Sequence, residues 1–279
     1  MPSFEDGVRN LIFNCLRLNR DARILVIFET TYDGYYDPAL APRFAKAAEV
    51  EGLTASLFGI PFDPNADRLS QELSAMMENV DGSVFFARLG DQLRFTKIGG
   101  SYPMAISYIA TSEMMASLYG AADYNGFVAL RKAIDAAIAN AARVEVTCPR
   151  GTCFEGPPPK LKNDDSCEVT ISRFPMLVST PVPANSFSGR VALPDFLVGT
   201  GSRYYKPYAV EFSEQLFALF KNGYLTGFEG ASEHVARANT HYDFVAEKFG
   251  IDRNFVHSWH VGIHPACVYD MNVSDNYER

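Results

Sequence analysis

The sequence lacks the features of a secreted or membrane-spanning protein. No apolar run approaches the roughly 18 to 20 residues that a membrane-spanning helix needs. The N-terminus, MPSFEDGVRN, has no basic segment followed by an apolar one, so it does not resemble a signal peptide. The five cysteines are odd in number, which is not typical of a disulfide framework. We therefore expect a soluble, cytoplasmic protein with free thiols and no membrane partner.

The chain also has no excess of positive charge. Its formal net charge is -8 at pH 7, because 33 Asp and Glu outnumber 25 Lys and Arg. Proteins that bind nucleic acid need clustered cations to neutralise the phosphates. We therefore expect no nucleic-acid partner, although local basic surface remains compatible with an acidic peptide.

The common catalytic signatures are absent. The sequence contains no GxGxxG, GxxxxGK[ST], GxSxG or HExxH motif. The segment Gly199–Ser202 is a short glycine-containing turn without the strand-to-helix setting of a phosphate-binding loop. These motifs therefore point to neither a nucleotide-binding protein nor a common hydrolase.

The first half of the chain alternates between strand and helix patterns. With 279 residues and 47% hydrophobic residues, it can build one large domain or two ordinary ones. Apolar residues of 8–16 share one helical face, and Asp37-Pro38 is typical of a helix start. Further helices are predicted over 69–78 and 126–142, and strands over 23–28, 54–58, 83–87 and 104–109. This alternation predicts an α/β domain over 1–147 with a doubly wound, mostly parallel sheet.

The composition changes in the second half. The segment 148–165 carries four prolines and two glycines, which is typical of an exposed loop or a domain junction. Strand-like residues interrupted by Pro and Gly follow, and helices are predicted over 206–220 and 232–249. This pattern favours a second, α+β domain over 148–279.

Three histidines near the C-terminus form the densest group of residues with possible chemistry. His257, His260 and His264 have H-x2-H-x3-H spacing, with Glu229 upstream together with His234 and His241. Imidazole is a ligand of zinc, iron and copper. However, Gly262 and Pro265 favour a strand and turn over a helix, and isolated histidines are more often buried, hydrogen-bonded groups. Glu229 could act as a general acid, a general base or a metal ligand, but a single glutamate next to a glycine is also typical of a turn.

Two further segments have a binding or catalytic interpretation. Cys148 and Cys153 lie in VTCPRGTCF, where a nucleophile is one reading and an inert thiol the more common one. The segment 202–208 places two cations among three tyrosines, a composition suited to gripping a peptide through cation–π contacts and hydrogen bonds. The candidate peptide-binding residues are Arg203, Tyr204, Tyr205, Lys206 and Tyr208. Packing at a sheet edge explains them equally well.

Several segments, in order, resemble the superfamily of thermophilic-type metallo-aminopeptidases and 2,5-dihydroxypyridine 5,6-dioxygenase-like proteins. The resemblance covers nearly the whole chain, through the segments RILVIF, RVEVTCPRGTCF, ISRFPMLVSTP, FSGRVALP, TGFEG and SWHVGIHP. It implies an N-terminal α/β sheet and a C-terminal domain whose carboxylates and histidines bind iron or another divalent metal. Dimers are common in that superfamily, so a homodimer is implied as well.

The same resemblance implies that most metal ligands are missing. The position of a ligand glutamate falls near Val178, and the aspartate of the GTD segment is Cys153 here. His260 matches a position that binds metal in the family. The later His-x-His or His-x-Asp segment has no counterpart before the chain ends at Arg279. The chain thus resembles a truncated member, and tight metal sites need at least three protein ligands.

Two functional hypotheses follow from this comparison. Truncated relatives resemble crocagin-type accessory proteins, which implies a non-catalytic protein without a cofactor. It would hold a precursor peptide of a ribosomal-peptide natural-product pathway in the inter-domain cleft and present it to the modifying enzymes. The alternative is an iron-dependent ring-cleaving dioxygenase or an aminopeptidase-like enzyme that uses His257, His260, His264 and Glu229. We prefer the first hypothesis.

Overall fold

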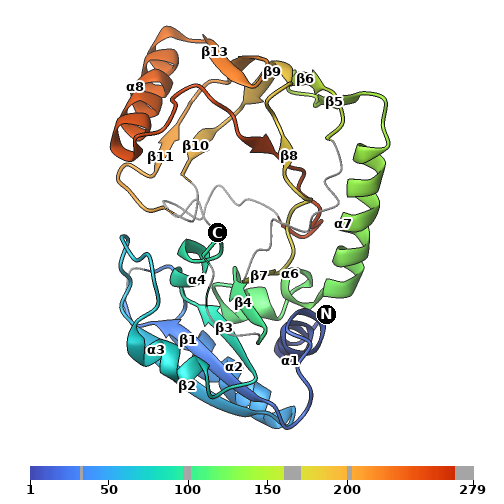
Figure 1. The fold of residues 1–279 in the computed structure, drawn as a ribbon, viewed down its shortest axis with the longest axis vertical. Helices are drawn as coiled ribbons and strands as arrows, with labels where there is room; N and C mark the ends of the chain where they lie inside the picture. Colours follow the sequence, from blue (N-terminus) through green and yellow to red (C-terminus); the bar gives the residue numbers. More distant parts are fainter. Residues whose placement is uncertain (32–33, 97, 99–101, 160–170, 200–202, 268–279) are drawn as a thin grey trace.

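The N-terminal half is built on a five-stranded parallel sheet. The computed structural model describes residues 1–31, 34–96, 98, 102–159, 171–199 and 203–267 (Figure 1). The strand order is β2-β1-β3-β4-β7, and every neighbouring pair is parallel. The strands are β1 (Arg23–Glu29), β2 (Thr54–Ile60), β3 (Gly82–Phe86), β4 (Met104–Ser107) and β7 (Ser172–Phe174). The predicted parallel sheet is therefore confirmed.

Helices cover both faces of this sheet because its strands are apolar on both sides. In β1, Ile24 and Val26 belong to one buried cluster, whereas Leu25 and Ile27 belong to the other. The first cluster takes in α1 (Phe4–Arg9), the π-helix η1 (Asn10–Cys15), α2 (Leu40–Val50) and α5 (Ser112–Met115). The second takes in α3 (Gln71–Met77) and lies beside α4 (Leu89–Gln92). Each fully buried aliphatic side chain stabilises the fold by about 1.5–3 kcal/mol. Because helices cover both faces of the sheet, the predicted doubly wound architecture is confirmed.

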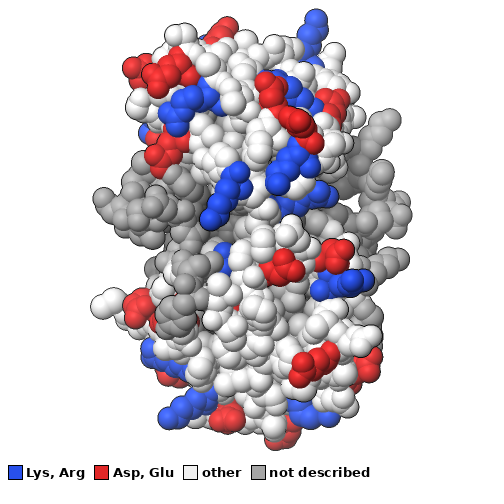
Figure 2. Space-filling model, turned by 90° about the vertical axis from the view of Figure 1, so that its left-hand side faces the viewer, with Lys and Arg blue, Asp and Glu red and all other residues white. Residues whose placement is uncertain are grey.

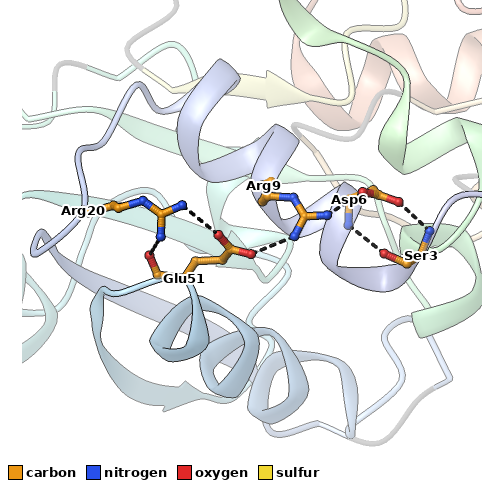
Figure 3. A network of polar contacts seen from close by, with 5 residues as sticks. All are labelled: Ser3, Asp6, Arg9, Arg20 and Glu51. Carbon is orange, nitrogen blue, oxygen red and sulfur yellow. Dashed lines mark hydrogen bonds and ion pairs between the residues drawn. The ribbon is translucent and has the colours of Figure 1, made fainter.

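A polar network ties α1 to the end of α2 (Figure 3). Ser3 and Asp6 form a capping box at the start of α1. Arg9 bridges from Asp6 to Glu51, at 2.5 and 2.7 Å, and Glu51 also pairs with Arg20 at 3.5 Å. Partly exposed ion pairs contribute only about 0–1 kcal/mol each. The network therefore positions the helices more than it stabilises them.

The second domain is built on an antiparallel sheet with the order β13-β12-β9-β6-β5. Its strands are β5 (Val144–Thr147), β6 (Cys153–Gly156), β9 (Ser188–Leu193), β12 (Leu216–Lys221) and β13 (Tyr224–Glu229). Helix α8 (Ser232–Phe249) packs beside β13 and ends at Gly250, whose φ of +62° is left-handed. Both the α+β class and the predicted helix over 232–249 are confirmed.

The helix predicted over 206–220 is wrong. Strand β11 (Ala209–Glu211), which pairs with β10 (Phe196–Val198), and most of β12 replace it. Asn222 and Gly223 take positive φ values of +50° and +78°, which is the geometry of a tight hairpin between β12 and β13. That turn lets Leu216 and Ala218 alternate into the core, so the period is two and not 3.6.

The chain crosses between the two halves several times. Helix α7 (Tyr124–Ala139) runs alongside both (Figure 1). The boundary predicted at residues 147 and 148 does not coincide with the change of sheet, because β5 joins the second sheet and β7 returns to the first. Strand β14 (Ser258–Trp259) pairs with β8 (Val182–Pro183), and Ile263 then enters the core of the first half. The last described segment therefore connects both halves.

Two further expectations concern membrane-spanning helices and free thiols. None of the described helices combines the length and apolar character required to cross a bilayer. Cys15, Cys148, Cys153 and Cys267 are free, and Cys167 lies outside the described residues.

Candidate functional site

The first sheet has a topological switch point between β1 and β3. From β1 the chain passes through α2 to β2 on one side, and from β2 through α3 to β3 on the other. In open α/β sheets, ligands bind at the carboxyl ends of the strands beside such a reversal. Here Glu29 is the last residue of β1, and Arg88 follows the end of β3.

A buried ion pair between Glu29 and Arg88 fills this position. Glu29 Oε1 accepts hydrogen bonds from the Arg88 backbone N–H at 2.6 Å and from Nε at 3.0 Å. Glu29 Oε2 accepts from Arg88 Nη2 at 2.6 Å, and the two side chains are only 2% and 8% exposed. The geometry is bidentate, which suits a desolvated guanidinium–carboxylate pair.

Aromatic rings surround the Arg88 guanidinium. Its central carbon lies 3.5 Å from the Phe62 ring centroid, 4.6 Å from that of Tyr35 and 5.8 Å from that of Tyr204. Phe62 and Tyr204 meet edge to face at 5.0 Å. Because Tyr204 comes from the second half of the chain, the switch point is part of the contact between the two halves.

The predicted peptide-binding segment therefore lies beside the switch point. Tyr204 and Tyr208 stack at 5.9 Å, and Tyr205 contacts Tyr208 at 5.6 Å and Phe249 of α8 at 5.5 Å. Burial raises the pKa of Tyr205. Arg203 lies over Phe249 at 5.1 Å, and both Arg203 and Lys206 are exposed. The tyrosines thus form an aromatic cluster and the two cations face solvent, while their role in binding a peptide stays a prediction.

A second cluster of polar side chains lies beside α4, at the carboxyl ends of the parallel strands. The Tyr108 hydroxyl donates to Asp91 Oδ1 at 2.7 Å, and Asp91 also forms an ion pair with Arg94. Burial, followed by the neighbouring Asp91 charge, raises the pKa of Tyr108 far above its ordinary value. Asp91 is buried, so this group is preorganised and not a loose surface pair.

Arg173 and His260 extend this group towards the second half. Arg173 pairs in register with Ile106, so it lies on the same sheet face as Tyr108, which follows Ile106 by two residues just after the end of β4. Among the described residues, no carboxylate is hydrogen-bonded or ion-paired to Arg173. Desolvation, then the charges of Arg173 and Arg94, lower the pKa of His260. The region around these side chains is therefore electropositive. No local pattern in the sequence indicated that Arg94, Arg173 and His260 lie close together.

The side chains predicted as metal ligands are dispersed. His264 is 5% exposed and its ring stacks on Phe127 at 4.5 Å and packs near Tyr119 at 5.3 Å. Burial lowers the pKa of His264, and a hydrogen bond to the Tyr119 backbone opposes that effect. The ring is thus a packed group between the last described segment and the helices of the first half.

Glu229 and His257 lie elsewhere. Glu229 is exposed at the end of β13, opposite Phe217, and His257 is exposed beside Phe255. Within the described ranges, no three His, Cys, Asp or Glu side chains converge as metal ligands do. The set Glu229, His257, His260 and His264 therefore does not fit a metal site. The strand-and-turn prediction for the histidine segment is confirmed by β14 and by the bridge between Val178 and Gly262.

Charged side chains are unevenly distributed on one face of the molecule (Figure 2). Figure 2 shows several Lys and Arg side chains gathered just above the waist of the visible face, on the half that carries the second sheet. Acidic side chains are more scattered on that face. The visible face thus carries a local group of cations just above its waist, although the whole chain carries a net charge of -8.

Comparison with known proteins identifies the fold. No protein-family model and no curated protein matches the chain. The structure is similar to that of 2,5-dihydroxypyridine dioxygenase from Pseudomonas putida KT2440, with a TM-score of 0.57, 15% sequence identity, and coverage of 92% of this chain and 75% of that one. AmpT from Thermus thermophilus matches with a TM-score of 0.45 and 11% identity over 86% and 74% of the two chains. The likeness to the dioxygenase is one of fold, and it extends over most of this chain.

Proposed function

We propose that this protein binds an extended peptide bearing a carboxylate at the carboxyl edge of the parallel sheet, without catalysing a reaction. The observation that carries the proposal is the half-buried Arg173, which has no anionic partner among the described residues and lies beside Arg94 and His260. A partly buried guanidinium without a counter-charge favours a planar, bidentate carboxylate partner. The peptide supplies that carboxylate.

The aromatic cluster supports the same role. Tyr204, Tyr205 and Tyr208 form a surface beside the switch point, with Arg203 and Lys206 exposed next to it. Tyrosines and arginines are enriched where proteins recognise peptides, because they combine large contact area with hydrogen-bonding groups. The peptide's backbone and apolar groups lie along these rings while its acidic group reaches Arg173.

The biological partner in this proposal is the precursor peptide of a ribosomal-peptide natural-product pathway. The support is the sequence resemblance to accessory proteins of such pathways, and the protein then presents the peptide to the modifying enzymes. A homodimer is compatible with this role. The switch point supports a binding role over a catalytic one, because the protein's own Glu29–Arg88 pair and the ring of Phe62 occupy it.

Calorimetry tests the proposal. Each short peptide encoded beside the gene is titrated into chelator-treated protein, and we expect micromolar affinity for one of them. The Arg173→Ala variant is expected to bind at least about tenfold more weakly, equivalent to 1.4 kcal/mol. Arg150→Ala is the matched control, because Arg150 is exposed in the turn between β5 and β6. Absence of heat with every peptide contradicts the proposal.

The metal-dependent alternative has a clear test of its own. It requires Glu229, His257, His260 and His264 to act together, and no described contact joins them. Turnover of a dihydroxypyridine or of an aminoacyl substrate that depends on added iron or another divalent metal would replace the binding proposal with the enzymatic one.

A further inference from the structure

A cavity of about 270 Å³ opens on the outer side of the switch point. It lies between the carboxyl ends of β1 and β2, the start of α3, and α4. Its walls include the apolar side chains of Phe58, Ile60, Phe62, Leu73 and Leu89. Cavities of roughly 150 Å³ already hold benzene in other proteins, so this one accommodates a group of the size of an amino-acid side chain.

Gln92 lines the cavity and carries an unpartnered acceptor just behind the cavity wall. Its Nε2 donates to the Asp63 carbonyl oxygen at 2.9 Å, which fixes the orientation of the amide. Its Oε1 is buried and has no hydrogen-bond partner within the described part of the chain. Buried acceptors are nearly always paired in native proteins, so a ligand donor that displaces the side-chain atoms covering Oε1 gains a hydrogen bond.

The charges around the cavity favour a cation over an anion. Glu29 lines it but is already neutralised by Arg88. Asp63 and Glu72 are the remaining carboxylates in the lining, against the single guanidinium of Arg68. Arg68 itself lies 3.8 Å from Asp67 on the exposed surface. The excess of negative charge attracts an ammonium group and disfavours a carboxylate.

We propose that this cavity binds a side-chain-sized ligand with an apolar body and a cationic amine. The apolar body contacts Phe58, Ile60 and Leu73, and the N–H donor reaches Gln92, with Glu72 supplying opposite charge. The site is separate from the electropositive region of Arg173 and prefers the opposite charge. The inference therefore stands independently of the proposed peptide binding.

Three aromatic probes of similar size but different charge test the chemistry of the site. Benzylamine, benzyl alcohol and benzoate are titrated into isotopically labelled protein, and chemical shifts of Leu73, Leu89 and Gln92 are followed by NMR. We expect benzylamine to bind with a dissociation constant of about 1 mM, typical of a fragment with few heavy atoms. Benzyl alcohol is expected to bind several-fold more weakly and benzoate not to bind. Equal binding of benzoate and benzylamine overturns the proposal.

Variants separate binding in the cavity from adsorption at the surface. Ala66 lines the cavity, so Ala66→Phe is expected to fill it and to abolish the benzylamine shifts. Gln92→Leu is expected to weaken benzylamine at least about fivefold, equivalent to 1 kcal/mol. Gln215→Leu is the control, because Gln215 is a half-buried glutamine in the other half of the protein whose amide, like that of Gln92, donates to a backbone carbonyl oxygen. Unchanged affinity in both cavity variants overturns the proposal, and Arg173→Ala is expected to leave benzylamine binding intact.

Discussion

Arg88 donates three side-chain hydrogen bonds to the Glu29 carboxylate, and its backbone N–H donates a fourth. Glu29 is the last residue of β1, and Arg88 follows the end of β3. The winding of the sheet reverses between these two strands. Open α/β folds usually keep this position for a ligand. In this protein a buried ion pair under Phe62 holds it, and the two proposed binding regions lie to either side, at Arg173 of β7 and at the cavity beside β1 and β2.

Breaking this pair is expected to destabilise the protein strongly. Glu29→Gln leaves the Arg88 guanidinium buried without its counter-charge, which costs about 3–5 kcal/mol. Urea denaturation measures the loss. The control is Asp81→Asn, which breaks the exposed pair between Arg23 and Asp81, and its effect is expected to be far smaller. Equal losses in the two variants contradict the role assigned to Glu29.

The hairpin between β12 and β13 is expected to depend on Gly223. Its φ is +78°, and a Cβ there would lie 2.6 Å from the Asn185 Cα and 2.7 Å from the Ala184 carbonyl oxygen. Gly223→Ala is therefore expected to cost more than about 1 kcal/mol. Gly227 of β13 is the matched control, because an added Cβ meets nothing within 4 Å. Thermal unfolding of the two variants distinguishes the positions, and equal stabilities contradict the assigned turn.

Stability is expected to fall as the pH drops below the ordinary histidine pKa. Burial lowers the folded-state pKa of His264, so the unfolded chain binds a proton more readily than the native one. The stabilising contribution is complete above about pH 6.5 and decreases from there through the folded-state pKa. His264→Phe is expected to reduce this pH dependence in urea titrations, whereas His257→Phe, at an exposed position, is expected to leave it unchanged. Identical pH profiles for His264→Phe and the wild type contradict this account of the ring.

Metal content is expected to be far below stoichiometric. The residues named as ligands lie apart, with His264 packed on Phe127 and Glu229 exposed on β13. Elemental analysis after anaerobic expression with added iron provides the measurement, and a chelator is expected to leave the melting temperature unchanged because no folding energy comes from metal binding. A stoichiometric metal that survives purification contradicts the binding proposal and favours the enzyme.

The sequence was sufficient for elements whose pattern is local. The apolar run of β1 and its partners predicted the buried parallel strands, and Ser232–Phe249 carried a helical period ended by Gly250. The segment from 206 to 220 failed because its apolar residues fit either period. The neighbouring Asn222-Gly223 turn, a known hairpin signal, would have decided between them.

The candidate site depended on contacts that no local pattern contains. Arg173 meets Tyr108 only because β7 leaves the second half of the chain and joins β4. His260 reaches the same region through the segment that begins with β14. The histidine spacing suggested one cluster, whereas the strand-and-turn backbone sends His264 into the core and leaves His257 exposed. Topology therefore determined the site, and residue type alone did not.

We propose that Arg173 recognises a carboxylate of the bound peptide. The most direct measurement is the dissociation constant of the peptide and of its amidated, carboxylate-free analogue, for the wild type and for Arg173→Gln. We predict that the wild type binds the analogue at least about tenfold more weakly, and that Arg173→Gln binds both peptides equally. A preference for the carboxylate that persists in Arg173→Gln, or equal affinities in the wild type, would contradict the account.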